Sequence, residues 1–128
     1  MGGDGPLERR RILIVDDDST VGSVIRRVLR DHDVTLVTSA TEAIAMLETG
    51  AGFDLILCDM NMPELDGADF YRRVAESWPE QAARVVFLTG DTDQLTIRPL
   101  LASVPHLSKP FEIAELRALV AARLSRCA

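Results

Sequence analysis

Short apolar runs alternate with amphipathic segments through almost the whole chain of 128 residues. Five runs are rich in the branched and aromatic residues that favour strands: RILIV (11–15), VTLV (34–37), FDLILC (53–58), RVVFL (84–88) and HLS (106–108). Strands that alternate with helices form a parallel sheet, because right-handed strand-helix-strand crossovers place helices over both faces. The sequence therefore predicts an α/β fold, in which a doubly wound sheet of five parallel strands lies between two helical layers.

Five amphipathic segments separate or follow these runs. They cover residues 19–31, 39–50, a third stretch that ends before Pro79, 91–104 and 112–126. In the first segment the apolar residues on one helical face are Val21, Val24, Ile25, Val28 and Leu29. In the third they are Phe70, Tyr71, Val74 and Trp78, and in the last they are Ile113, Leu116, Val120 and Leu124. Each of these faces is predicted to cover the sheet.

Local signals predict where some helices begin and end. Ser39 and Glu42 have the spacing of a capping box, and Gly50 is expected to end the same helix. Pro99 lies inside the fourth segment, so that helix should begin late, kink or break.

Length and composition indicate a single domain. Residues 1–10 are Gly-rich, charged and non-periodic, which is typical of a flexible leader or a linker remnant, so we expect the domain to cover residues 11–128. No run is long enough to span a bilayer and the start lacks a signal peptide, which predicts a cytoplasmic protein without membrane insertion. The net charge of −6 argues against direct nucleic-acid binding. Two isolated cysteines, Cys58 and Cys127, do not make a zinc site, and Cys58 is predicted to belong to the core.

Polar side chains follow four of the five predicted strands. Asp16 and Asp17 follow the first, Asp59 the third, Thr89 the fourth and Lys109 the fifth. Because the carboxyl ends of parallel strands share one edge of a sheet, these side chains are expected to converge. Crowded carboxylates repel each other, and a hard cation such as Mg²⁺ relieves that repulsion. A lysine and a hydroxyl beside the cation suit a transferring phosphoryl group, and an aspartate can accept that group as an acyl phosphate.

Other acidic residues have simpler explanations. Asp18 is predicted to cap or open the first helix together with Ser19, and Asp66 before Gly67 is read as a turn or helix cap. In the acidic run at 16–18, Asp16 and Asp17 are therefore expected at the cation site and Asp18 at the start of the helix.

With these residues in place, the chain resembles the receiver domain of two-component response regulators, a flavodoxin-like module. Four motifs carry the resemblance: ILIVDDD, LILCDMNMPELDG, VVFLTG and HLSKPF. They cover residues 11 to about 123 in the order that the family shows. The resemblance implies a (βα)5 three-layer sandwich with strand order 2-1-3-4-5.

The resemblance also implies a role for each site residue. Asp59 would accept a phosphoryl group from a histidine of a sensor histidine kinase or a phosphotransfer protein. Mg²⁺, for which Mn²⁺ could substitute, would be held by Asp16, Asp17, Asp59 and the backbone carbonyl of Asn61. Lys109 would pair with phosphoryl oxygens and Thr89 would donate to one of them.

Further positions are implied to have modulating or structural roles. The Lys109-Pro110 peptide resembles the family's cis bond, and Gly67 shapes the turn after the phosphoacceptor strand. Asn61 and Asp91 lie where the family varies its slow self-dephosphorylation. The chain departs from the family at two places: His106 replaces a switching Tyr or Phe, and Pro99 interrupts a helix of the output face. We therefore expect a monomer or weak dimer rather than the family's usual dimer.

The sequence leaves open two alternative functions and does not identify the output of the domain. Asp16, Asp18 and Thr20 also fit the opening motif of haloacid-dehalogenase-like phosphohydrolases, with Asp16 as the nucleophile, although a later acidic pair is missing. A flavodoxin-like FMN carrier would need a phosphate loop where this chain has an acidic one. The kinase is expected to dock near the first helix, with Val21 as a candidate contact, and the source protein is either a stand-alone receiver or a hybrid sensor histidine kinase.

Overall fold

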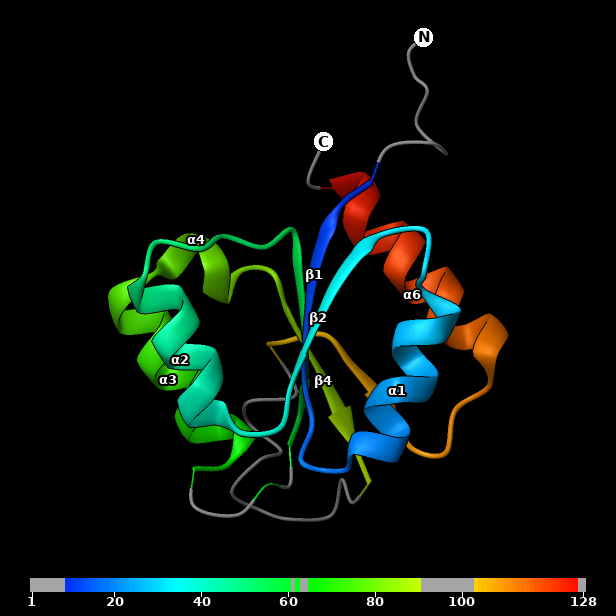
Figure 1. The fold of residues 1–128 in the computed structure, drawn as a ribbon, viewed down its shortest axis with the longest axis horizontal. Coiled ribbons are helices and arrows are strands. Elements are labelled where there is room, and N and C mark those ends of the chain that lie inside the picture. Colours follow the sequence, from blue (N-terminus) through cyan, green and yellow to red (C-terminus); the bar gives the residue numbers. More distant parts are fainter. Residues whose placement is uncertain (1–8, 61, 63–64, 91–102, 127–128) are drawn as a thin grey trace, which may run out of the picture.

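The computed structural model describes residues 9–60, 62, 65–90 and 103–126, and its centre is a five-stranded parallel sheet. The strands are β1 (Arg11–Val15), β2 (Asp33–Val37), β3 (Leu55–Asp59), β4 (Val85–Thr89) and β5 (His106–Ser108). Their order is β2-β1-β3-β4-β5, with every neighbouring pair parallel. The predicted fold class and strand order are therefore confirmed (Figure 1).

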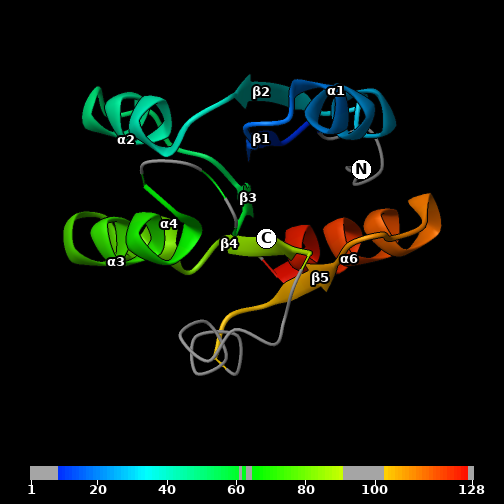
Figure 2. The same ribbon diagram turned by 90° about the horizontal axis from the view of Figure 1, so that it is seen from below.

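Helices cover both faces of the sheet. They are α1 (Ser19–Val28), α2 (Ala40–Glu48), α3 (Gly67–Ser77), α4 (Pro79–Ala82) and α6 (Ile113–Arg126). Figures 1 and 2 show α2, α3 and α4 on one side of the sheet, with α1 and α6 side by side on the other. Among the residues described, no helix has both the length and the apolar character needed to span a membrane.

The central strands β1, β3 and β4 are apolar except at one end each, where Arg11, Asp59 and Thr89 lie, because both of their faces are buried. Successive side chains of a strand point to opposite faces, so Leu13 and Val15 pack under α2 and α3, while Ile12 and Ile14 pack under α1 and α6. The sheet thus separates two apolar cores, and it fixes the carboxyl ends of β1, β3 and β4 next to one another.

The helix caps follow the sequence signals. Asp18 accepts hydrogen bonds from the backbone N–H groups of Thr20 and Val21 and so caps α1. At α2, Ser39 Oγ accepts from the Glu42 N–H (3.1 Å), while Glu42 Oε1 accepts from the N–H of Thr38 (3.2 Å). Gly50 follows α2 with a φ of 94°, the left-handed conformation that glycine adopts without strain.

The predicted end of the third helix before Pro79 is confirmed, and the structure adds a short helix, α4, that begins at Pro79, because proline is compatible with the first helical turn. Two predictions about buried helix residues are wrong. Val24 is 54% exposed, since it lies about 100° around α1 from the buried Ile25. Ile113 is also 54% exposed, because it is the first residue of α6 and helical side chains point back beyond the amino end.

Some predicted features cannot be compared with the structure. Asn61, Asp91, Pro99 and Cys127 lie outside the described residues, as does most of the helix predicted over residues 91–104.

Candidate phosphoacceptor and metal site

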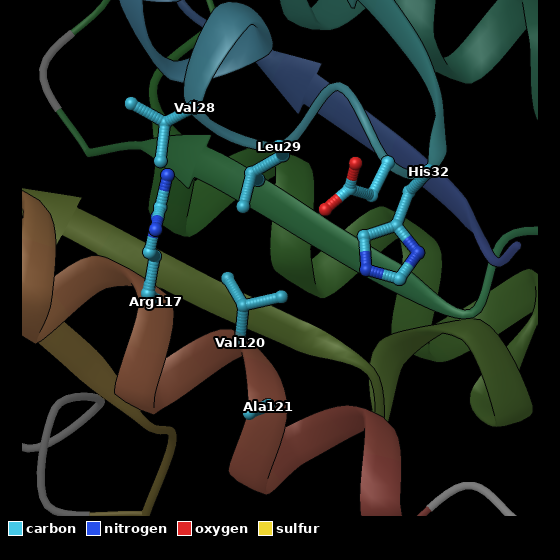
Figure 3. A pocket seen from close by; sticks show the side chains of 7 residues that line it. Val28, Leu29, His32, Arg117, Val120 and Ala121 are labelled. Atoms are coloured by element: carbon cyan, nitrogen blue, oxygen red, sulfur yellow. The ribbon is translucent and has the colours of Figure 1, made fainter. Parts of the chain in front are cut away.

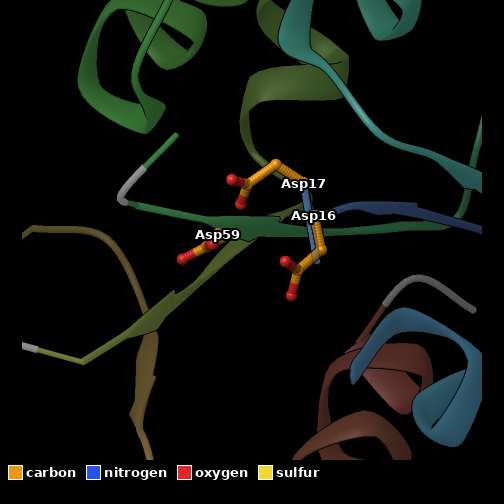
Figure 4. Close-up of side chains that lie close together, drawn as sticks. All are labelled: Asp16, Asp17 and Asp59. Carbon is orange, nitrogen blue, oxygen red and sulfur yellow. The ribbon is translucent and has the colours of Figure 1, made fainter. Parts of the chain in front are cut away.

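The carboxyl ends of the strands bring the predicted acidic residues together. Asp16 directly follows β1 and Asp59 is the last residue of β3, so the two carboxylates lie on adjacent strands. Asp16, Asp17 and Asp59 each offer one oxygen, and these oxygens all lie within 4.8 Å of one another (Figure 4). The structure therefore shows the convergence that the sequence pattern predicts.

The acidic residues differ in their exposure to solvent. Asp16 is fully buried and Asp59 is 5% exposed, whereas Asp17 is exposed. One oxygen of Asp16 accepts a hydrogen bond from the Asp18 backbone N–H (2.9 Å), which fixes its orientation. A buried carboxylate needs a compensating charge, and Asp16 and Asp59 both obtain one from the same lysine.

Lys109, the only lysine in the chain, lies between the two buried carboxylates. Its Nζ is 3.5 Å from Asp16 Oδ2 and 3.5 Å from Asp59 Oδ1. The backbone N–H of Lys109 donates to the carbonyl of Thr89 (2.6 Å), which ties the start of the β5–α6 loop to the end of β4. With all four groups ionised, three carboxylates and one ammonium carry a net charge of −2, which a divalent cation would neutralise.

Thr89 ends β4 with a buried hydroxyl that has no hydrogen-bond partner among the described residues. A buried hydroxyl without a partner costs free energy, so its retention calls for an explanation. Thr89 lies at the same edge of the sheet as Asp59, because its neighbour Leu88 is in register with Asp59. A ligand at the acidic cluster could accept a hydrogen bond from this hydroxyl.

The acidic cluster suits a hard divalent cation. Mg²⁺ takes oxygen ligands at roughly 2 Å, so ligands on opposite sides of the ion are roughly 4 Å apart. The three carboxylate oxygens, within 4.8 Å of one another, are close to that spacing. Asp16, Asp17 and Asp59 could therefore hold the ion with little rearrangement.

Cys58 lies next to the cluster, but its thiol belongs to the core. It is fully buried, and its Sγ donates to the carbonyl oxygen of Asp59 (3.4 Å). Burial raises the pKa of the Cys58 thiol well above its usual value, and the nearby carboxylates of Asp59, Asp16 and Asp66 raise it further. The thiol is therefore protonated and is not a nucleophile at neutral pH.

The resemblance also implies roles for His106 and for the Lys109-Pro110 peptide, and the structure shows where both lie. His106 is an exposed residue of the edge strand β5, in register with Phe87 of β4. The Lys109-Pro110 peptide is cis, as the resemblance implies.

Gly67 allows the chain after Asp59 to fold closely against the start of α3. Its N–H donates to the carbonyl of Met60 (3.0 Å). A Cβ atom at this position would lie 2.8 Å from the Cα of Met60 and 3.0 Å from the backbone oxygen of Asp59. Only a residue without a Cβ permits this approach.

We predict that Gly67→Ala destabilises the domain by about 1–3 kcal/mol, because the added methyl group must displace backbone rather than a flexible side chain. Urea unfolding followed by circular dichroism measures the change. Gly52→Ala is the matched control, since its Cβ would meet nothing closer than Gln81 Nε2 at 3.7 Å. Equal stability of the two variants would contradict the close approach at Gly67.

Comparison with known proteins agrees with this geometry. The family model of the response regulator receiver domain matches residues 12–121. The chain is 34% identical over 107 residues to the hydrogenase transcriptional regulatory protein HoxA of Bradyrhizobium diazoefficiens, covering 82% of the chain and 22% of HoxA. It is 33% identical over 122 residues to the DNA-binding response regulator MtrA of Mycobacterium tuberculosis, covering 92% of the chain and 52% of MtrA. The chain thus spans about half or less of the length of these relatives.

Solved structures show the same fold. A response regulator receiver domain protein from Clostridium thermocellum has a TM-score of 0.77 and 28% identity, covering 91% of this chain and 94% of that one. A CheY-like receiver domain protein from Methanospirillum hungatei has a TM-score of 0.81 and 24% identity, covering 94% and 97%. The chain belongs to the response regulator receiver domain family, whose members act in phosphorelay signalling.

Membership in this family argues against the phosphohydrolase alternative, and the structure gives a physical reason. In the hydrolase motif both Asp16 and Asp18 would act at the site. Asp18 is instead exposed, and its carboxylate caps α1.

Proposed function

We propose that Asp59 accepts a phosphoryl group from a phosphohistidine of a sensor histidine kinase or phosphotransfer protein. The observation that carries the proposal is the position of the Asp59 carboxylate: nearly buried, 3.5 Å from Lys109 Nζ and grouped with Asp16 and Asp17. The Thr89 hydroxyl, for which the described part of the chain offers no hydrogen-bond partner, lies at the same edge and supports the proposal. Phosphorylation would then change the partners that the domain binds.

In the proposed reaction, a carboxylate oxygen of Asp59 attacks the phosphorus atom of the donor. A P–O bond forms, the P–N bond of the phosphohistidine breaks, and the leaving imidazole keeps the electron pair and takes up a proton. Lys109 offsets the negative charge of the transferred group, and Thr89 donates a hydrogen bond to one of its oxygens. Slow attack by water on the acyl phosphate would return Asp59 to its starting state.

Mg²⁺, or Mn²⁺ in its place, would be held by Asp16, Asp17 and Asp59 and would neutralise charge on the transferring group. The resemblance adds the carbonyl of Asn61 to these ligands and gives Asn61 and Asp91 an influence on dephosphorylation; both residues lie outside the described part of the chain.

Exposed apolar side chains near the site support docking of the phosphodonor on α1 and α6. Val24 and Ile113 are each 54% exposed, and Val21 is half-buried. Both helices start at the site edge, since α1 follows Asp18 directly and α6 begins four residues after Lys109. We propose that Val21, Val24 and Ile113 contact the donor, whose histidine must come within bonding distance of Asp59.

Incubation with acetyl phosphate tests the chemistry without a protein partner. With Mg²⁺ present, intact mass should show one phosphoryl adduct that hydroxylamine removes, since acyl phosphates react with that nucleophile. With EDTA, the adduct should be absent, because the crowded carboxylates then repel the anionic donor. An adduct of equal yield in EDTA would contradict the role of the metal, and no adduct under either condition would contradict the proposed function.

Docking is tested separately with Val24→Asp. We expect it to slow transfer from a phosphorylated histidine kinase roughly tenfold or more, because a carboxylate placed in an apolar contact must be desolvated without a partner, and a cost of about 1.4 kcal/mol already corresponds to a factor of ten. The donor is the kinase that labels the wild-type chain fastest in a panel of purified kinases. Ala45→Asp on the exposed face of α2 is the control. Labelling by acetyl phosphate should be unchanged in both variants, and equal transfer rates would count against docking on α1.

A further inference from the structure

Arg9 and Arg10, which lead into β1, are hydrogen-bonded to two other parts of the fold at the end of the sheet opposite the site. The Arg10 N–H donates to His32 Nδ1 (3.1 Å), and the Arg10 carbonyl accepts from the Asp33 N–H (2.9 Å). Arg10 Nη1 donates to the Leu124 carbonyl in α6 (3.4 Å), and Arg9 Nη2 donates to the His32 carbonyl (3.4 Å). The Arg9–Arg10 segment therefore connects the turn between α1 and β2 with the last turns of α6.

The contact with His32 depends on the protonation of its ring. Because Nδ1 accepts a hydrogen bond, the imidazole is neutral and carries its proton on Nε2. The ring lies beside a cavity of about 160 Å³ between α1 and α6. Figure 3 shows the side chains that line it. The residues that line the cavity are Val28, Leu29, Asp31, His32, Arg117, Val120 and Ala121. The space admits water, so a proton can reach the ring without unfolding of the domain.

The charged groups around His32 shift the pKa of its imidazole in opposite directions. Partial burial lowers the pKa of the imidazole, and the Arg10 and Arg9 guanidinium groups lower it further. The carboxylates of Asp31 and Asp54 act in the opposite direction, but the net result is a lowered pKa. Arg117 of α6 also lines the cavity, but its side chain lies next to Val28 rather than next to the ring (Figure 3). The surroundings therefore favour the neutral ring that the hydrogen bond from Arg10 requires.

We propose that His32 is a pH-sensitive switch that holds the Arg9–Arg10 segment when its ring is neutral and releases that segment when the ring is protonated. A protonated ring presents an N–H to the Arg10 N–H, so two donors face each other and a further positive charge lies beside two arginines. Because the pKa in the held state is below that of a free histidine, the held state is favoured above about pH 6.5 and is weakened as the pH falls below that value. The attachment of Arg10 to α6 weakens with it.

Nuclear magnetic resonance on the whole chain tests the switch. In the wild type, the order parameter of the Arg10 amide should fall from about 0.85 towards about 0.6 or below between about pH 7.5 and about pH 5, as the His32 ring titrates. The Ile14 amide in the buried β1 strand is the internal reference and should not change.

Two variants separate His32 from other causes. His32→Asn places a neutral oxygen acceptor near the position of Nδ1, so the Arg10 order parameter should become independent of pH. The chain has one other histidine, and His106→Asn should behave as the wild type does. A constant Arg10 order parameter in the wild type while His32 titrates would overturn the proposal. So would a pH dependence that survives in His32→Asn or is lost in His106→Asn.

Discussion

Asp59→Asn is expected to abolish the phosphoryl adduct that the wild type forms with acetyl phosphate and Mg²⁺. The amide has nearly the same shape as the carboxylate but is a far weaker nucleophile, and it removes one negative ligand from the cluster within 4.8 Å. Asp17 is exposed, and one oxygen of Asp16 already accepts a hydrogen bond from the Asp18 N–H, so we expect Asp59, which lies 3.5 Å from Lys109 Nζ, to be the carboxylate that reacts. Intact mass after acetyl phosphate treatment gives the answer directly.

Asp18→Asn is the matched control for this substitution. Asp18 is two residues from Asp16, yet its side chain caps α1, and asparagine is as good a cap as aspartate. The variant should therefore keep both its stability and its phosphoryl adduct. A hydroxylamine-sensitive adduct that persists in Asp59→Asn would place the phosphoacceptor on another residue and contradict the proposed function.

The sheet and its functional edge follow from the sequence for a simple physical reason. A strand buried on both faces must be apolar along its whole length, so the first charged or hydroxyl residue marks its end. Asp16, Asp59 and Thr89 could each be placed in this way, and parallel pairing then makes those ends neighbours. The strand ends were accurate to one or two residues; Asp59, for example, proved to be the last residue of β3 rather than the residue after it.

Side-chain exposure on the helices was harder to predict. Val24 satisfies a helical apolar pattern as well as Ile25 does, and only the position of α1 relative to α6 decides which of them is buried. The sequence does not predict helix α4, because Pro79 ends the preceding helix and the same residue also favours the first turn of a new one. The contact of Arg10 with His32 joins residues 22 apart and has no pattern in the sequence.

The second large effect is on stability: Lys109→Met should destabilise the domain by about 2–3 kcal/mol in buffer without divalent cations. Removing one partner of a buried ion pair costs about 3–5 kcal/mol. We expect about 2–3 kcal/mol here, because the Lys109 side chain is 25% exposed and solvent screens part of its interaction. Asp16, which is fully buried, and Asp59 then face each other without the ammonium group 3.5 Å from each. Urea unfolding with and without Mg²⁺ measures the cost.

Magnesium should recover much of the stability lost in Lys109→Met, because a divalent cation among the three carboxylates supplies the positive charge that the lysine no longer provides. The control is Arg72→Met, which removes an exposed ion pair with Asp69 and should change stability by less than about 1 kcal/mol, with no response to Mg²⁺ beyond that of the wild type. If the Lys109→Met protein were as stable as the wild type without Mg²⁺, the buried carboxylates would not depend on this lysine. If Mg²⁺ stabilised the wild type and both variants equally, the ion would not be compensating for the missing ammonium group.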